Sequence, residues 1–496
     1  SKSRGNVVDP IHVMEGVGLQ TLLDKIKNGN LPASEHKAAM IAQRKDFPKG
    51  IPECGADGLR YGLLTYMKQG GSINLDINVV LGCRNFCNKL WQAFKLSSMF
   101  FEGASFKVPR FNSTACISAA SATEEAKDLS LIDKWILSKL HNATLECKKG
   151  FESFEFAAIT TACKQFWYDE FCDYYLEMIK PVLYGDDVGA KAAAAKTLYI
   201  CVDGGLRLLH PLMPFVTEEL FQRLPGRTHS EDCCDSIMVA RYPSPEATER
   251  WSNKALEEKM GDVLSVIVSC TRKLRSIVGL NMEKTELYIK APADRKSDSS
   301  MKIEDFAGVI GTLTYSDKVE FISDESKAPA KSLNEVKSGY TMYLPAGAFK
   351  SKMERLVLEY EKKANDAATR CGDIKARMES DTYIAKTPQN IKDKDAESLR
   401  KLSGECEQHR ASLKMFLDMM TGAERKALHE KKVQAWSQKL QKATKELEDY
   451  NAKIPAKEDR SYKKVMHKLT PKIKKAEMLK RQAGATLDKL RKMEVN

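Results

Sequence analysis

The chain has 496 residues, of which 43% are hydrophobic and 29% charged, and its formal net charge is +12. This length predicts roughly three domains of about 150 residues each. No apolar run approaches the ~18 residues that a membrane-spanning helix requires, so we expect no membrane insertion. The 13 cysteines include no Cys-x-x-Cys pair, which argues against a disulfide framework; we expect reduced thiols in the cytosol and assign no metal site.

The positive charge is concentrated at one end of the chain. Residues 1–350 hold 44 Lys and Arg against 44 Asp and Glu, while residues 351–496 hold 35 against 23. Within that tail, residues 423–496 hold 21 against 10 and so carry +11 of the +12. This excess predicts a polyanionic partner at the C-terminal end.

The first half of the chain has a helical pattern. Residues 19–60 predict one helix followed by a Pro- and Gly-rich loop, which leads into an apolar helix over residues 57–67. From residue 76 to about 223, apolar residues recur at steps of three and four. We therefore expect a bundle of four or five helices that closes near Tyr242.

The pattern changes after this bundle. One more helix is expected over residues 253–277, followed by alternating runs at 286–291, 318–323 and 339–345, with a helix at 301–313 between the first two runs. These elements predict a small α+β module of three or so strands.

The tail returns to helix with a heptad repeat. Steps of four and three connect apolar residues from Met353 to Met378 and from Leu399 to Met420, and Pro388 lies in the turn between these arms. A third arm ends before Pro455, and Thr470 with Pro471 resembles the N-cap and first position of a fourth. The fold class is therefore mainly α, with a helical bundle, a small α+β module and two antiparallel coiled-coil hairpins.

Several segments resemble a known family. SKSRGNVVDP at residues 1–10 resembles the KMSKS signature of class I aminoacyl-tRNA synthetases, with its first Lys and Met missing, and GADGLRYGLLTY at 55–66 resembles their D-A-L-R helix. Four further segments are similar in order and spacing to valyl-tRNA synthetases: QGGSINLD, GCRNFCNKLWQA, SLIDKWILSKL and LHPLMPFVTEELFQRL. The resemblance covers residues 1 to about 420, and the isoleucyl family remains the alternative within the class.

This resemblance implies a domain order. We expect the end of the class I catalytic domain at 1–75, the helical anticodon-binding domain at 76–250, the α+β module at 251–350, a tRNA-binding coiled-coil arm at 351–422, and a second, basic hairpin at 423–496. The second hairpin is not part of the family pattern.

The resemblance also implies a chemistry. Lys2 matches the catalytic lysine of the signature, and Ser1, Lys2 and Ser3 match its ATP-binding residues. The family activates valine with ATP and Mg²⁺, transfers it to tRNA(Val) and edits misactivated threonine. A HIGH-type motif, a valine pocket and an editing domain are not found in these 496 residues, so we expect the chain alone to bind tRNA without catalysis. Its insert from Leu19 to Glu53 resembles the cytosolic eukaryotic branch.

Candidate tRNA contacts fall on two elements. On one helix, Arg84, Asn88 and Trp91 share a face, and Asn85 and Lys89 lie on the neighbouring one, so that Trp91 could stack on a base. The alternative is that Asn88 and Trp91 belong to the bundle core. The basic tail offers phosphate contacts at Lys463, Lys464, Lys468, Lys472 and Lys475. The alternative for this tail is a coiled coil that docks other translation factors or associates with itself. The alternative for the chain is a free-standing tRNA-binding or scaffold protein.

Other conspicuous side chains receive a structural role. Trp167, Tyr168, Tyr174 and Tyr175 cluster at helical spacing, which is more typical of a core than of base stacking. The histidines lack partners at nucleophile or metal spacing, and we assign them no catalytic role.

Overall fold

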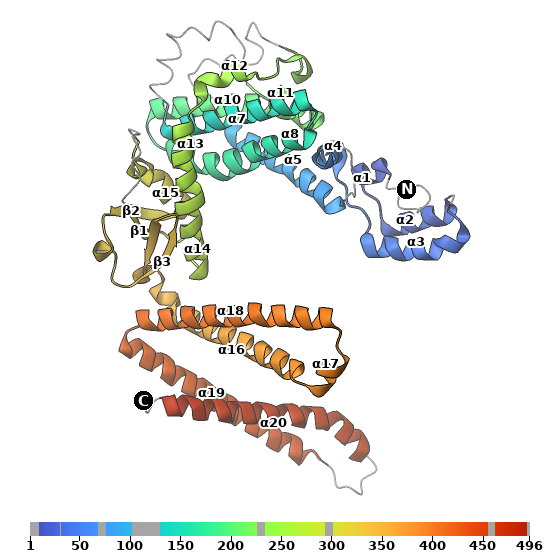
Figure 1. Cartoon of the computed structure of the whole chain (residues 1–496), viewed down its shortest axis with the longest axis vertical. Coiled ribbons are helices and arrows are strands. Elements are labelled where there is room, and N and C mark those ends of the chain that lie inside the picture. The colour runs from blue at the N-terminus through green and yellow to red at the C-terminus, as the bar shows by residue number, and fades with distance from the viewer. Residues whose placement is uncertain are drawn as a thin grey trace. The chain divides into compact units, whose positions relative to one another are not determined.

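A computed structural model describes residues 9–29, 31–67, 76–101, 129–225, 234–292, 301–454 and 462–493 (Figure 1). The chain divides into two compact units. The first comprises residues 1–272, 289–321 and 336–340, and the second comprises residues 273–288, 322–335 and 341–496. None of the described helices is both long and apolar enough to cross a membrane.

The first unit begins with four helices, α1 (Pro10–Glu15), α2 (Leu19–Asn28), α3 (Ala33–Asp46) and α4 (Gly55–Tyr66). The expectation of one helix and a loop before α4 was wrong, because α2 and α3 are separate helices. A small apolar cluster that includes Val13, Leu22 and Leu59 ties α1 and α2 to α4. It leaves α3 without a buried residue, which is why the apolar period of α3 is weak in the sequence.

The helical bundle confirms the mainly α expectation. It contains α5 (Ile77–Ser98), α7 (Leu131–Ser153), α8 (Phe156–Lys164), α9 (Leu176–Leu183), α10 (Val188–Leu209) and α11 (Pro214–Gln222). Side-chain caps stabilise the N-termini of two of these helices. The Asp76 side chain accepts the Asn78 N–H at the start of α5, and Ser130 with Asp133 forms a capping box on α7. Pro214 occupies the first turn of α11, where a missing N–H costs nothing.

A π-helical segment, Gln165–Tyr175, joins α8 to α9. It buries Trp167 and Tyr175, which confirms the expected core role for these two aromatic residues. The indole N–H of Trp167 donates to the Gly205 carbonyl at 3.0 Å. Tyr168, by contrast, is 37% exposed and lies on the surface of the bundle.

Beyond the bundle, α12 (Pro245–Thr248) precedes a helical stretch made of α13 (Lys254–Gly261), a π segment (Asp262–Val268) and α14 (Ser269–Ile277). The strands β1 (Thr285–Lys290), β2 (Ser316–Ile322), β3 (Ser332–Lys337) and β4 (Tyr340–Pro345) form one sheet in the order β2-β1-β4-β3, and α15 (Ala307–Thr314) precedes β2. The strand β3 was not predicted from the sequence. Its signal was the two-residue loop Ser338–Gly339, both at positive φ, which is typical of a tight hairpin.

The second unit contains the expected helical arms, α16 (Met353–Met378), α18 (Gln389–Met419), α19 (Gly422–Ala452) and α20 (Tyr462–Met493), with a short α17 (Asp381–Lys386) in the first turn region. α16 packs on α18 and α19 on α20. The heptad positions Val357, Ala364 and Ala367 are buried, as the repeat predicted. One boundary was wrong: α20 begins at Tyr462 and contains Pro471.

Candidate functional site

The first unit has a cleft of about 400 Å³ where α4, α5 and α11 meet. Its walls are the first turn of α4, one face of α5 and the start of α11. The lining residues are Cys54, Gly55, Ala56, Asp57, Gly58, Arg84, Cys87, Asn88, Trp91, Phe215, Val216 and Glu219. The cleft thus contains Arg84, Asn88 and Trp91, three side chains that the sequence offers as candidate tRNA contacts.

Two glycines let α4 and α5 cross closely beside the cleft. A Cβ atom at Gly58 would lie 3.3 Å from the Arg84 backbone nitrogen, and one at Gly62 would lie 3.1 Å from a methyl carbon of Val80. Gly58 replaces the alanine of the D-A-L-R pattern, and it lies where the α5 backbone approaches α4. Gly58 weakens the helix α4 locally, but its lack of a side chain allows the close contact with the backbone of Arg84 beside the cleft.

Among the described residues, Arg84 is the one cation that lines the cleft, and no described residue pairs with it. Its side chain is half-buried, and within the described part of the chain it makes no ion pair or hydrogen bond. Its Nη1 lies 3.6 Å from the position that a Cβ atom at Gly55 would take, next to the start of α4. Cys54 begins α4 without a side-chain cap, so the positive end of this helix faces the same space.

Asn88 and Trp91 add recognition chemistry. The Asn88 amide is exposed and makes no hydrogen bond to any described residue. Trp91 is 38% exposed, so it is not the bundle-core residue that one of the two interpretations proposed. The Arg223 guanidinium lies 5.2 Å from the centre of the Trp91 ring, and Arg223 also pairs with Glu219. An aromatic face, an amide and an unpaired cation therefore share one cleft.

Asp57 has a different role in the same cleft. It is buried, and its carboxylate accepts the backbone N–H groups of Phe215 at 3.2 Å and Val216 at 2.6 Å. Burial raises the pKa of Asp57, while these two N–H donors oppose that shift. Because Glu219 is paired with Arg223 and Asp57 with α11, neither acid of the cleft engages Arg84.

The other two predicted contacts on α5 lie outside the cleft lining. Lys89 pairs with Asp173 at 2.6 Å, and its ammonium lies 3.0 Å from the centre of the Tyr168 ring. Lys89 therefore already neutralises a carboxylate. Asn85 is exposed on the neighbouring face. The roles of Asn85 and Lys89 in tRNA binding stay predictions.

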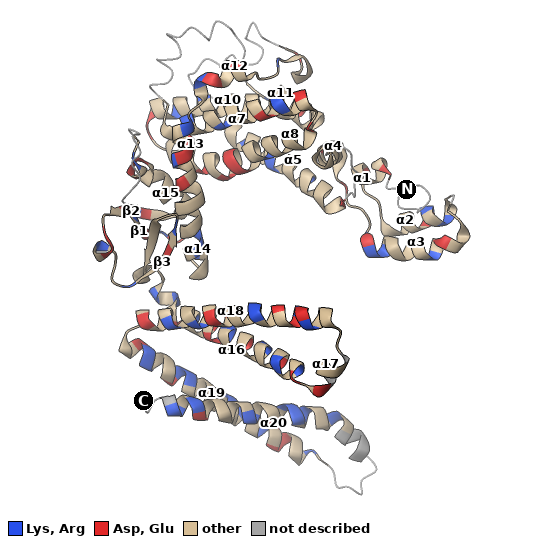
Figure 2. Ribbon diagram, viewed as in Figure 1, with Lys and Arg blue, Asp and Glu red and all other residues tan. Residues whose placement is uncertain are grey.

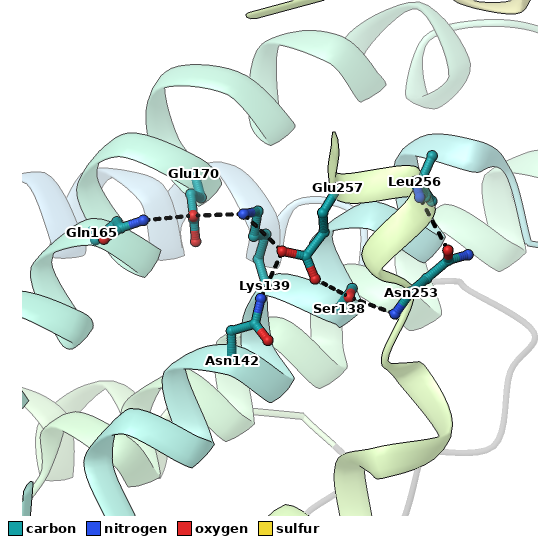
Figure 3. A network of polar contacts seen from close by, with 8 residues as sticks. All are labelled: Ser138, Lys139, Asn142, Gln165, Glu170, Asn253, Leu256 and Glu257. Carbon is teal, nitrogen blue, oxygen red and sulfur yellow. Dashed lines mark hydrogen bonds and ion pairs between the residues drawn. The ribbon is translucent and has the colours of Figure 1, made fainter. Parts of the chain in front are cut away.

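A buried polar network lies elsewhere in the bundle (Figure 3). The Lys139 ammonium of α7 lies 3.0 Å from Glu257 of α13 and 3.5 Å from Glu170 of the π segment. Ser138 and Asn142 donate to Glu257, and Gln165 donates to Glu170 at 3.1 Å. Burial raises the pKa of Glu170. Every polar head shown has a partner, so this network fastens α13 to the bundle and does not offer a binding site.

The basic tail places its predicted contacts on α20. Lys468, Lys472 and Lys475 are exposed. The side chains of Lys463 and Lys464 lie outside the described residues, although both belong to α20. Ser1, Lys2 and Ser3 also lie outside the described residues, so the structure does not place the predicted ATP contacts.

Comparisons with known proteins show which families the chain resembles. Residues 133–290 match the family described as the anticodon-binding domain of tRNA ligase. A valine-tRNA ligase of Mus musculus is 36% identical over 421 residues, which covers 85% of this chain and 32% of the relative. The enzyme of Caenorhabditis elegans is 36% identical over 419 residues, covering 83% and 38%. These findings relate the chain to the C-terminal portion of valyl-tRNA synthetases.

One relative is a mitochondrial enzyme. The mitochondrial valine-tRNA ligase of Homo sapiens is 39% identical over 332 residues, covering 66% of this chain and 29% of the relative. The chain thus spans about a third of the length of the valyl-tRNA synthetases that it matches. Within the class, these relatives favour the valyl over the isoleucyl interpretation.

The matched residues supply only part of the cleft. The matched domain supplies Phe215, Val216 and Glu219 to the cleft, while α4 and α5 precede the matched residues. Neither Asp57, which lines the cleft, nor Arg223, which lies beside Trp91, was predicted from the sequence. The sequence signal for Asp57 is an acidic residue between Gly55 and Gly58, at the start of an otherwise mostly apolar helix.

Proposed function

We propose that this chain is the tRNA-binding part of a valine-tRNA ligase, and that the cleft between α4, α5 and α11 binds one nucleotide of the tRNA. The observation that carries this proposal is the half-buried Arg84 guanidinium, which has no partner among the described residues and shares the cleft with Asn88 and Trp91. Arg84 and the start of α4 would hold a phosphate. Trp91 would stack on the base and Asn88 would hydrogen-bond to its edge.

Several further roles belong to this proposal and rest on the sequence resemblance to class I valyl-tRNA synthetases. The whole enzyme would attach valine to tRNA(Val) with ATP and Mg²⁺, through a valyl-adenylate, and would edit misactivated threonine. Lys2, with Ser1 and Ser3, would hold the ATP phosphates. The hairpin of α16 and α18 would support the bound tRNA, and the enzyme would work in the cytosol.

The test of the cleft uses the full chain and a fluorescently labelled tRNA(Val) transcript. Arg84→Gln removes the phosphate contact and Trp91→Leu the stacking surface, and each is expected to lower the affinity by about 5- to 150-fold, corresponding to ~1–3 kcal/mol. Lys95→Gln is the matched control, because Lys95 is an exposed cation on the same helix outside the cleft. Its affinity is expected to stay within twofold of the parent chain.

The specificity of the cleft can be read in the same assay. A base-reading cleft predicts that Asn88→Ala reduces the difference in affinity between tRNA(Val) and a tRNA with another anticodon. If Arg84→Gln and Trp91→Leu bind tRNA(Val) as tightly as Lys95→Gln does, the cleft is not the tRNA site. If the parent chain does not bind tRNA at all, the tRNA-binding proposal is wrong and the result favours the free-standing scaffold protein.

A further inference from the structure

The helix α20 is the most basic element of the second unit (Figure 2). From Tyr462 to Met493 it carries eleven Lys and Arg residues against two acids, Glu477 and Asp488. The two acids are 11 residues apart, which places them on the same flank of the helix. The remaining surface of α20 is therefore almost free of negative charge.

On the neighbouring helix α19, two lysines form ion pairs with the first hairpin. Lys431 pairs with Glu354 at 2.8 Å and Lys432 with Glu361 at 2.6 Å, and both acids belong to α16. These ion pairs fasten the second hairpin to the first. By contrast, Lys468, Lys472 and Lys475 on α20 make no ion pair with any residue that the structure describes.

Packing determines which way these three lysines face. Leu469, Ala476 and Ala483 of α20 are buried in the seam with α19. On a helix, positions 468, 472 and 475 lie on one flank of this seam, opposite to the flank that carries Glu477 and Asp488. They span about 10 Å along the axis at 1.5 Å per residue. The fold therefore presents a row of exposed ammonium groups, which we name the α20 basic row.

We propose that the α20 basic row binds the phosphate backbone of an RNA duplex, as in the stems of a tRNA, without reading its sequence. Lysine ammonium groups act as point charges that suit phosphate oxygens without base recognition. A row with regular spacing and no ion pair to any described residue fits a repeating polyanion. Only the choice of RNA as the polyanion rests on the proposed function.

The experiment measures the salt dependence of binding to a 16-base-pair RNA duplex that has no anticodon loop. The variant Lys468→Gln, Lys472→Gln, Lys475→Gln removes three charges from exposed positions of α20. The control variant, Lys37→Gln, Lys45→Gln, Lys49→Gln, removes three exposed charges near the N-terminus. Both variants have the same net charge, so a difference between them cannot come from the overall field.

The row variant is expected to reduce the slope of log K against log[salt] by about 2–3, and the affinity at 0.1 M salt by roughly 10- to 100-fold. The control variant is expected to keep the parent slope. An unchanged slope in the row variant, or an equal loss in both variants, would overturn the proposal. Circular dichroism shows whether the row variant retains its helices.

The two proposals fail separately. Duplex binding through the α20 basic row can persist when the Arg84 cleft does not bind tRNA, because the duplex has no anticodon. If the row variant keeps full affinity for the duplex and loses affinity for an acidic peptide instead, the partner is a protein and the RNA proposal is wrong.

Discussion

The carboxylate of Asp57 in α4 accepts the backbone N–H of Val216 in α11, at an N···O distance of 2.6 Å. It also accepts the N–H of Phe215 at 3.2 Å, so one side chain serves two of the donors that the start of α11 leaves free. The two partners are more than 150 residues apart in the chain. This contact holds one wall of the candidate tRNA cleft against another.

Asp57→Asn is expected to weaken the start of α11. An amide has one oxygen acceptor and presents its NH₂ group to the second N–H, so we expect a local loss of about 1–3 kcal/mol. Hydrogen exchange over residues 214–222, followed by mass spectrometry, should then accelerate by about 5- to 150-fold. Asp24→Asn is the control, because Asp24 forms an exposed pair with Lys27; equal exchange in the two variants would contradict the capping role.

Gly205 and Gly82 are expected to respond to alanine in opposite directions. A Cβ atom at Gly205 of α10 would lie 2.8 Å from two ring carbons of Trp167, so Gly205→Ala should destabilise the bundle by about 1–3 kcal/mol. A Cβ atom at Gly82 of α5 would meet no atom within 4 Å. Gly82→Ala should therefore stabilise the chain by ~0.5–1 kcal/mol through helix propensity. Thermal unfolding of the two variants provides the measurement, and stabilisation by both would refute the packing argument.

Lys139 is expected to be essential to the network of Figure 3. Lys139→Met leaves the buried Glu170 and the half-buried Glu257 without their shared cation, which should cost about 3–5 kcal/mol in the free energy of unfolding. Adding Glu170→Gln to this variant removes one of the two negative charges and should recover part of the loss. Thermal unfolding of the single and double variants tests this coupling. Equal losses in both would show that charge compensation is not the cause.

Acid is expected to destabilise the bundle through His210. Its Nδ1 lies 2.7 Å from the Thr217 hydroxyl, and burial lowers the pKa of His210 below 6.5. Between the folded pKa and 6.5 the unfolded chain therefore binds more protons than the folded chain. The free energy of unfolding should fall as the pH drops through this window, by at most about 1.4 kcal/mol per pH unit for one group.

The measurement is the melting temperature from pH 7.5 down to pH 5, for the parent chain and for His210→Gln. The variant should lose less stability over this range, since it has no proton to take up at this position. His141 adds a second contribution of the same sign, because burial also lowers its pKa. Parallel curves for parent and variant would exclude His210 as a source of the acid sensitivity.

Much of the architecture was predictable from local pattern. The heptad steps from Met353 to Met378 predicted α16 because a helix buries one stripe, and Val357, Ala364 and Ala367 do lie in that stripe. The change from helical to alternating period predicted the β1, β2 and β4 strands. β3 was missed because Ser332–Lys337 has only one buried residue, so its alternation is weak.

The cleft was predictable only in part. Residues 84, 88 and 91 share a helix face by period alone, and this was sufficient to group Arg84, Asn88 and Trp91. The spacing of apolar residues does not specify which face of α5 packs against the core, so the sequence leaves two interpretations of Trp91. The 38% exposure of its side chain decides between them.

The amino-acid sequence by itself determined the helical and strand periods, the family resemblance and the concentration of positive charge in the last 74 residues, because each is a property of neighbouring residues or of composition. Only the tertiary structure decided how single charges are used. Lys89 is neutralised by Asp173, 84 residues away, and Asp57 caps α11, whereas Arg84 and Lys472 have no such partner among the described residues. Charges interact through distance in space, and chain separation does not set that distance before the helices pack.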